Sequence, residues 1–183
     1  KGDYKEAVGY LERCIDLYSG DSDRDLALLW LRKGSLFTLT EDFETAQKCF
    51  DQALQLDENI PDAYLLRAQM ESELGNTETA VEDLKRYESL AGPQPVIQAA
   101  LGGLYESAQD FENAEKCYTQ AISSENYEVQ ILAARGRCRI LLGDTEGALR
   151  DLERYLREDG EDPTGDVHAM LGMCRMEAQR YED

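Results

Sequence analysis

Apolar residues recur at helical spacing in paired stretches of about 14 residues along this chain, and short polar turns separate the stretches. Turns such as Thr40-Glu41-Asp42, Leu74-Gly75-Asn76 and Leu142-Gly143-Asp144 are rich in residues that end one helix and begin the next. The pattern therefore predicts pairs of antiparallel helices and an all-α fold.

A fixed period relates these helix pairs to one another. Alanine recurs in steps of 34 residues, and a small residue recurs twelve positions before each one: Ala46, Ala80, Ala114 and Ala148 follow Gly34, Ala68, Gly102 and Gly136. Such a period predicts a stacked array, in which each unit packs mainly on its neighbours. The small residues predict close helix crossings, with larger residues such as Phe50 and Tyr118 filling the remaining space.

One unit carries a fuller signature, consisting of Leu101-Gly102, Tyr105, Asp110-Phe111, Ala114, Tyr118 and Ala121. This spacing resembles the tetratricopeptide repeat, a helix-turn-helix unit of 34 residues. The resemblance covers nearly the whole chain and implies a right-handed superhelical solenoid of antiparallel helix pairs. We expect a single array over residues 1–183, with complete units at 27–60, 61–94, 95–128 and 129–162. Residues 1–18 would be the second helix of a truncated unit and 165–183 the start of another, so we expect an excerpt of a longer protein.

Units of two kinds alternate, and a charge pair distinguishes them. Arg67 and Arg135 precede the small-residue slot in one kind, and Asp83 and Asp151 follow sixteen residues later. This spacing predicts an Arg–Asp pair that joins the two helices of a unit, which we favour over a ligand-binding role. Extra residues at 19–23 and 159–162 predict two lengthened acidic loops.

Charge and cysteine content restrict the partners. The chain has 38 acidic and 19 basic residues, a net charge of −19, which makes nucleic acid and anionic membrane surfaces poor partners. Its five cysteines form no CxxC pair, so free thiols in a reducing compartment are expected. We therefore predict a cytoplasmic location, although a targeting signal could lie outside the excerpt.

Catalytic motifs are missing from the sequence. It has one histidine, His168, no glycine-rich phosphate loop and no HExxH motif. We therefore expect no enzymatic activity, no cofactor and no metal site. Other units hold Trp30 or Tyr64 at the slot of His168, so we expect its ring in the core. The arginines between 135 and 157 have acidic neighbours, which predicts a solvated surface whose arginines pair with nearby acidic side chains.

The family resemblance implies that the first helices of the units line a concave face. The expected peptide-binding groove consists of Leu28, Leu31, Arg32, Leu65, Leu66, Gln69, Ala99, Ala100, Gly103, Ala133, Ala134, Arg137, Ala169, Met170 and Met173. Its small central residues leave room for a partner backbone, and its methionines can adapt to a ligand. We predict a protein-interaction scaffold that binds a protein or peptide ligand there. The alternatives are a structural spacer, homo-association through exposed stack ends, or a groove filled by another segment of the same protein.

Overall fold

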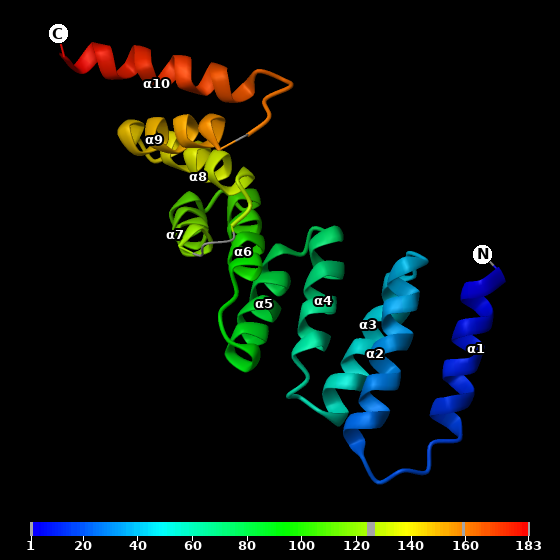
Figure 1. The fold of residues 1–183 in the computed structure, drawn as a ribbon. Helices are drawn as coiled ribbons and strands as arrows, with labels where there is room; N and C mark the ends of the chain where they lie inside the picture. The colour runs from blue at the N-terminus through cyan, green and yellow to red at the C-terminus, as the bar shows by residue number, and fades with distance from the viewer. Residues whose placement is uncertain (1, 124–126, 159, 183) are drawn as a thin grey trace. The chain divides into compact units, whose positions relative to one another are not determined.

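The computed structural model describes residues 2–123, 127–158 and 160–182, and regular secondary structure within these ranges is entirely helical (Figure 1). The helices are α1 (Gly2–Asp16), α2 (Asp23–Leu39), α3 (Phe43–Leu56), α4 (Pro61–Glu73), α5 (Thr77–Ala91), α6 (Pro95–Ser107), α7 (Phe111–Ile122), α8 (Gln130–Leu141), α9 (Thr145–Arg157) and α10 (Asp166–Glu182). The prediction of an all-α fold is confirmed. The chain divides into two compact units, Lys1–Gly92 and Pro93–Asp183, which we describe separately.

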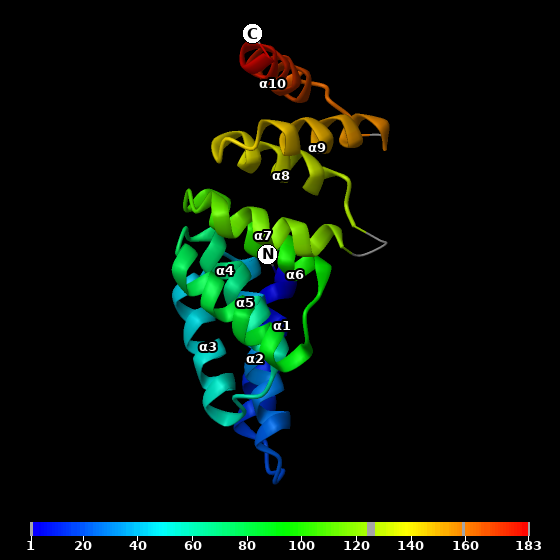
Figure 2. The same cartoon turned by 90° about the vertical axis from the view of Figure 1, so that its left-hand side faces the viewer.

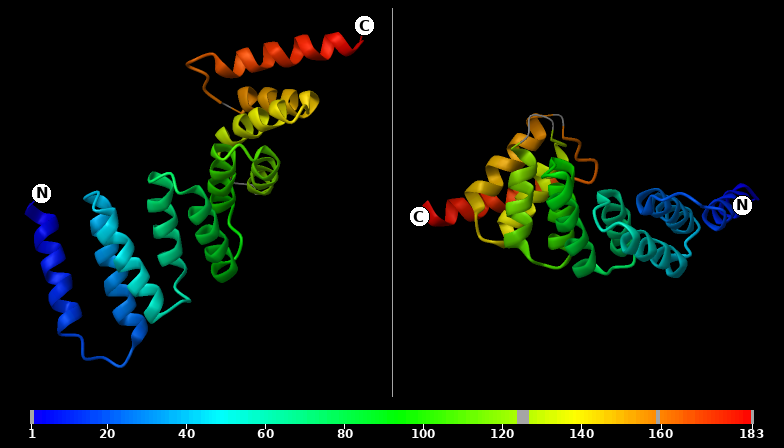
Figure 3. Two further views of the ribbon diagram at one scale, coloured as in Figure 1. Left: turned by 180° about the vertical axis from the view of Figure 1, so that it is seen from behind. Right: turned by 90° about the horizontal axis from the view of Figure 1, so that it is seen from below.

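The N-terminal unit contains α1 to α5. Helices α2 and α3 form one antiparallel pair and α4 and α5 a second, while α1 packs beside α2 (Figure 3). Phe50, Ala53 and Met70 have no exposed surface at the centre of this unit, and they pack with Ala27 and Ile60. The core thus lies between the helix pairs, as expected for stacked repeats.

Helix α2 starts earlier than the period predicts. It begins at Asp23 instead of near Ala27, because the Ser22 hydroxyl accepts a hydrogen bond from the backbone N–H of Asp25 at 3.2 Å. The extra residues before this unit therefore add a helical turn as well as lengthening the loop. The second long loop joins α9 to α10, and its Asp159 lies outside the described residues.

The C-terminal unit contains α6 to α10 (Figure 2). Helices α6 and α7 pair with each other, as do α8 and α9, and α10 packs on α9. Leu132 and Leu152 are fully buried in one core cluster together with Val167 and Leu171. A neighbouring cluster contains Tyr118, so each helix pair of this unit contributes to the apolar interior.

Helix crossings are tight at three glycines of the small-residue slot. A Cβ atom added at Gly34 would lie 2.7 Å from Phe50, and one at Gly102 would lie 2.5 Å from Tyr118. At Gly136 the nearest side-chain atom, from Leu152, would be 2.9 Å away. These distances are too short for a methyl group, which confirms the predicted role of the slot.

The turns within the helix pairs share one design. The second residue after the first helix has a positive φ, of 78° at Gly75 and 62° at Glu41, so the chain turns away from the helix there. In three of the turns an aspartate follows and caps the second helix, as when Asp42 accepts a hydrogen bond from the backbone N–H of Thr45 at 3.2 Å. Asp110 and Asp144 cap α7 and α9 in the same way. Asn76, which follows Gly75, makes no such side-chain hydrogen bond.

Candidate functional site

Two arginines join the helices of their units through paired hydrogen bonds. Arg67 donates from Nε and Nη2 to the carboxylate of Asp83 at 2.7 and 2.8 Å, and Arg135 contacts Asp151 in the same manner at 2.8 and 2.6 Å. The hydrogen bond to Asp83 raises the pKa of Arg67 even though burial opposes the shift. These contacts confirm the predicted interhelix pairs.

The same arginines also contact the preceding helix pair within their own compact unit. Arg67 donates from Nη1 to Asp51 at 2.8 Å, and Arg135 donates from Nη1 to Thr119 at 2.9 Å, each sixteen residues earlier in the chain. Arg139 adds contacts to Glu115 at 2.7 Å and to Asp151 at 2.9 Å. The interpretation of the arginine cluster as internally paired is confirmed for five of its arginines, namely Arg135, Arg137, Arg139, Arg150 and Arg154.

The core position predicted for His168 is wrong. Its side chain is 67% exposed, and its Nδ1 atom lies 2.6 Å from Oδ2 of Asp162. The loop before α10 folds back onto the start of that helix, where Asp162 also accepts the backbone N–H groups of Val167 and His168. Burial tends to raise the pKa of Asp162, but these hydrogen bonds hold it below its usual value.

The cysteines differ in exposure. Cys49, Cys138 and Cys174 are buried, and burial raises the pKa of the Cys138 thiol to about 11. Cys14 on α1 is exposed.

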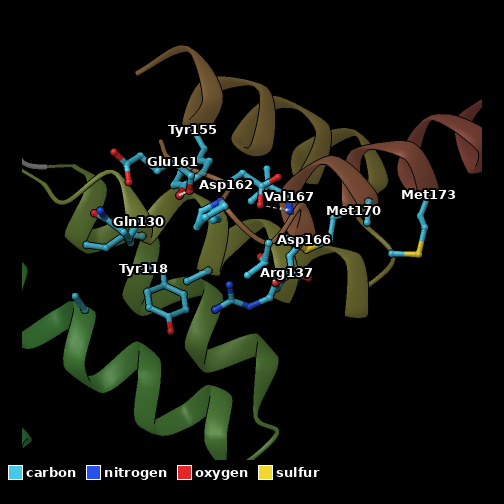
Figure 4. A pocket seen from close by; sticks show the side chains of 17 residues that line it. Tyr118, Gln130, Arg137, Tyr155, Glu161, Asp162, Asp166, Val167, Met170 and Met173 are labelled. Atoms are coloured by element: carbon cyan, nitrogen blue, oxygen red, sulfur yellow. Dashed lines mark hydrogen bonds between the residues drawn. The ribbon is translucent and has the colours of Figure 1, made fainter. Parts of the chain in front are cut away.

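A cleft of about 700 Å³ opens in the C-terminal unit between α8, α10 and the loop that precedes α10 (Figure 4). It brings together seven of the predicted groove residues, namely Ala99, Ala133, Ala134, Arg137, Ala169, Met170 and Met173. Ala133 is 6% exposed and also belongs to the core, whereas Met173 is 52% exposed. The cleft wall is therefore built on packed helices and presents small and flexible apolar side chains.

Polar groups at the base of this cleft hold one another in place. The Tyr118 hydroxyl donates to Glu106 at 2.7 Å, and Arg137 donates from Nε to the same carboxylate at 3.0 Å. Burial, followed by the hydrogen bond to Glu106, raises the pKa of Tyr118 strongly. Tyr118 thus stays neutral at physiological pH, and the charge of Arg137 is compensated by Glu106.

The rim of the cleft comes from the loop before α10 and the first turn of that helix, which the predicted groove does not contain. Glu161, Asp162 and Asp166 line it from the loop and the first turn of α10. The Tyr155 hydroxyl donates to the backbone carbonyl of Glu161, which ties this loop to α9. The predicted groove consists of residues on first helices only. The lengthened acidic loop at residues 159–162 is the sequence feature that could have indicated this rim.

Comparison with known proteins identifies the repeat. A family model described as tetratricopeptide repeat matches residues 40–95 and 100–164, and a second model of the same description matches residues 1–25. The chain belongs to the tetratricopeptide repeat family. No curated protein matches it.

Solved tetratricopeptide repeat structures share the fold at low sequence identity. MamA has a TM-score of 0.75 at 16% identity, over 86% of this chain and 90% of that one. YrrB, described as a TPR protein with an unusual peptide-binding site, has a TM-score of 0.77 at 15% identity, over 92% and 84%. PilF of Pseudomonas aeruginosa has a TM-score of 0.65 at 17% identity, over 86% and 72%.

The other predicted groove residues of this tetratricopeptide repeat chain do not line the cleft. Ala100 and Gly103 are on α6 but do not line it. The remaining six belong to the N-terminal unit: Leu28, Leu31, Arg32, Leu65, Leu66 and Gln69. Leu31 is 5% exposed in the core, and Leu28 and Leu66 pack against that core, which leaves them little surface for a ligand.

Neither a membrane span nor a metal cluster is found in the part of the chain that the structure describes. No described helix has both the length and the apolar character needed to cross a bilayer. Among the same residues, no three His, Cys, Asp or Glu side chains are grouped closely enough to hold a metal ion.

Proposed function

We propose that this tetratricopeptide repeat chain is a protein-interaction scaffold and that its C-terminal cleft binds an apolar peptide or helix of a partner protein. The observation that supports this proposal is the cleft itself, which has a volume of about 700 Å³ and is lined by seven of the residues predicted for a groove. Concave, mainly apolar sites with a few fixed polar groups are typical of ligand binding.

The lining residues suit a peptide ligand. Ala99, Ala134 and Ala169 have no side chain beyond Cβ, so a partner backbone can approach α6, α8 and α10 closely. Met170 and Met173 can adjust their rotamers to different apolar side chains. Apolar burial, at about 25 cal/mol per Å², would supply most of the binding free energy, and Arg137, held by Glu106, would orient the ligand.

Two methionines of α10 allow a matched test. Met173 lines the cleft and Met176 does not, yet their side chains are 52% and 64% exposed on the same helix. We would select peptides from a displayed random dodecapeptide library on the wild-type chain and measure their affinities by fluorescence anisotropy. Met173→Glu should weaken binding about tenfold or more, and Met176→Glu should leave the affinity unchanged. Equal effects of the two substitutions would place the binding site outside the cleft.

Exposed apolar side chains on the terminal helices favour a second candidate function, homo-association. Tyr10 on α1 is 59% exposed, and Met176 on α10 is 64% exposed. Leu171, also on α10, is only 5% exposed and belongs to the core, so it is not available for such a contact. Exposed apolar helix faces tend to find partners.

Light scattering over a range of protein concentrations tests this candidate. If the terminal helices associate, the molar mass should rise with concentration in the wild type and stay monomeric in Tyr10→Lys with Met176→Lys. A monomeric wild type at every concentration would remove homo-association.

A further inference from the structure

We infer that the segment bound by the cleft carries a lysine or arginine beside its apolar residues and that this cation docks at Glu161 and Asp166. The inference rests on the proposed function of the cleft and specifies the chemistry of the partner. It concerns the rim, which no part of the repeat signature supplies.

The carboxylates of the rim differ in how far the protein already uses them. Asp162 is occupied, because it accepts hydrogen bonds from two backbone N–H groups and lies 2.6 Å from the ring of His168. Asp166 accepts a hydrogen bond from the Thr164 hydroxyl at 2.6 Å. Within the described residues, no Lys, Arg or His side chain forms a salt bridge with Glu161 or Asp166, so neither carboxylate has a cationic partner there.

The single arginine of the cleft does not offset this charge. Arg137 is bound to Glu106 through two hydrogen bonds, of 3.0 and 3.4 Å, and that pair is close to neutral. A ligand carboxylate would therefore meet the repulsion of Glu161 and Asp166, while a ligand cation would be attracted. The net charge of −19 acts in the same direction over a longer range.

The arrangement also sets the spacing within the ligand. Figure 4 shows Asp166, Met170 and Met173 following one another along α10, with Glu161 beyond the acidic end. Asp166 and Met173 are seven residues apart, or about 10 Å along the helix axis. An extended ligand covers that distance in about three residues, so its cation and its main apolar side chain should be separated by that number.

Selection from the same peptide library tests the inference. Peptides enriched on the wild type should contain Lys or Arg about three residues from a large apolar residue. For such a peptide, Glu161→Gln with Asp166→Asn should lower the affinity about tenfold, and added salt should weaken the binding. The matched control is Glu112→Gln with Glu146→Gln, which removes two exposed carboxylates outside the cleft and should change the affinity less than about twofold.

Other outcomes overturn the inference in distinguishable ways. Enrichment of acidic peptides, or equal affinity for the rim variant and the control, would reject the cation while leaving peptide binding intact. If Met173→Glu abolishes a concentration-dependent dimer, the occupant of the cleft is a second copy of the chain. If no selected peptide distinguishes the wild type from Met173→Glu, both this inference and the proposed function fail.

Discussion

Glycines at one repeat position have different surroundings in different units. Gly34, Gly102 and Gly136 each face a side chain within 3 Å of where a Cβ atom would lie, whereas Gly172 on α10 faces open space. A glycine is therefore required only where another helix packs closely against this position. The place in the repeat alone does not require one.

Substituting alanine at two of these positions should have opposite effects. Gly102→Ala would force a methyl group against Tyr118, which is 5% exposed and hydrogen-bonded to Glu106. Overpacking of about 1–3 kcal/mol should outweigh a gain of about 1 kcal/mol in helix propensity, so urea denaturation should show a net loss of stability. Gly172→Ala is the control and should be neutral or stabilising. Equal stability of the two variants would contradict the steric account.

At the scale of elements, helices α4 and α8 differ from α2 and α6 in how they hold their partners. Helices α4 and α8 each carry an arginine that contacts the second helix of its own pair. The same arginine also contacts the second helix of the preceding pair. At the equivalent position of α6 lies Leu101, and Cys117 takes the place of the aspartate. We expect an apolar contact between these two side chains.

Removing one partner of a buried ion pair should cost more than replacing both. In Asp83→Ala, the Arg67 guanidinium loses its best partner in a mostly buried position, so the free energy of unfolding should fall by about 3 kcal/mol. Arg67→Leu combined with Asp83→Cys copies the residues found at 101 and 117 and should lie within about 1.5 kcal/mol of the wild type. Chemical denaturation measures the free energy of unfolding of both variants. A double variant as unstable as Asp83→Ala would contradict the expectation that replacing both partners costs less than removing one.

The capping aspartate of α7 should make stability depend on acid pH. Hydrogen bonds from the side chain and backbone of Asn113 lower the pKa of Asp110 in the folded state. A lowered folded-state pKa stabilises the fold above the unfolded value of about 3.9, and this contribution is lost as the pH falls through the folded-state pKa. Thermal melts between neutral pH and about pH 2 should show the loss, with a shallower slope in Asp110→Asn. An identical slope would exclude Asp110 as a contributor.

At the scale of the whole molecule, the excess of negative charge opposes folding, while the same charge favours cationic partners. A net charge of −19 on 183 residues produces repulsion that the many local salt bridges cannot cancel. Salt screens this repulsion over about 10 Å at 0.1 M ionic strength.

Added sodium chloride should therefore raise the melting temperature while it weakens the binding of a cationic peptide. Circular dichroism and anisotropy at low and physiological ionic strength measure the two effects on the same sample. A melting temperature that falls with salt would show that attractive ion pairs, such as Arg139 with Glu115, outweigh the overall repulsion.

Much of the fold could be predicted because its signals are local or periodic. Turn residues such as Asp42 and Gly75 act within a few positions of themselves, and Arg67 meets Asp83 because both recur at set places in the repeat. The start of α2 was missed because Ser22 caps a helix that extends beyond the repeat. The position of His168 was missed because it depends on a loop outside the period.

By itself, the sequence determined the helix pairs, the small-residue crossings, the internal pairing of the arginines and the acidic charge of this protein. The charge follows from composition alone. The other features follow from spacing along the chain, since residues a set number of positions apart meet in the repeated units. Only the tertiary structure decided which groove residues share a cleft, which lie in the core like Leu31, and that the loop before α10 supplies the rim. The physical reason is that these outcomes depend on packing between elements whose contacts no periodic spacing encodes.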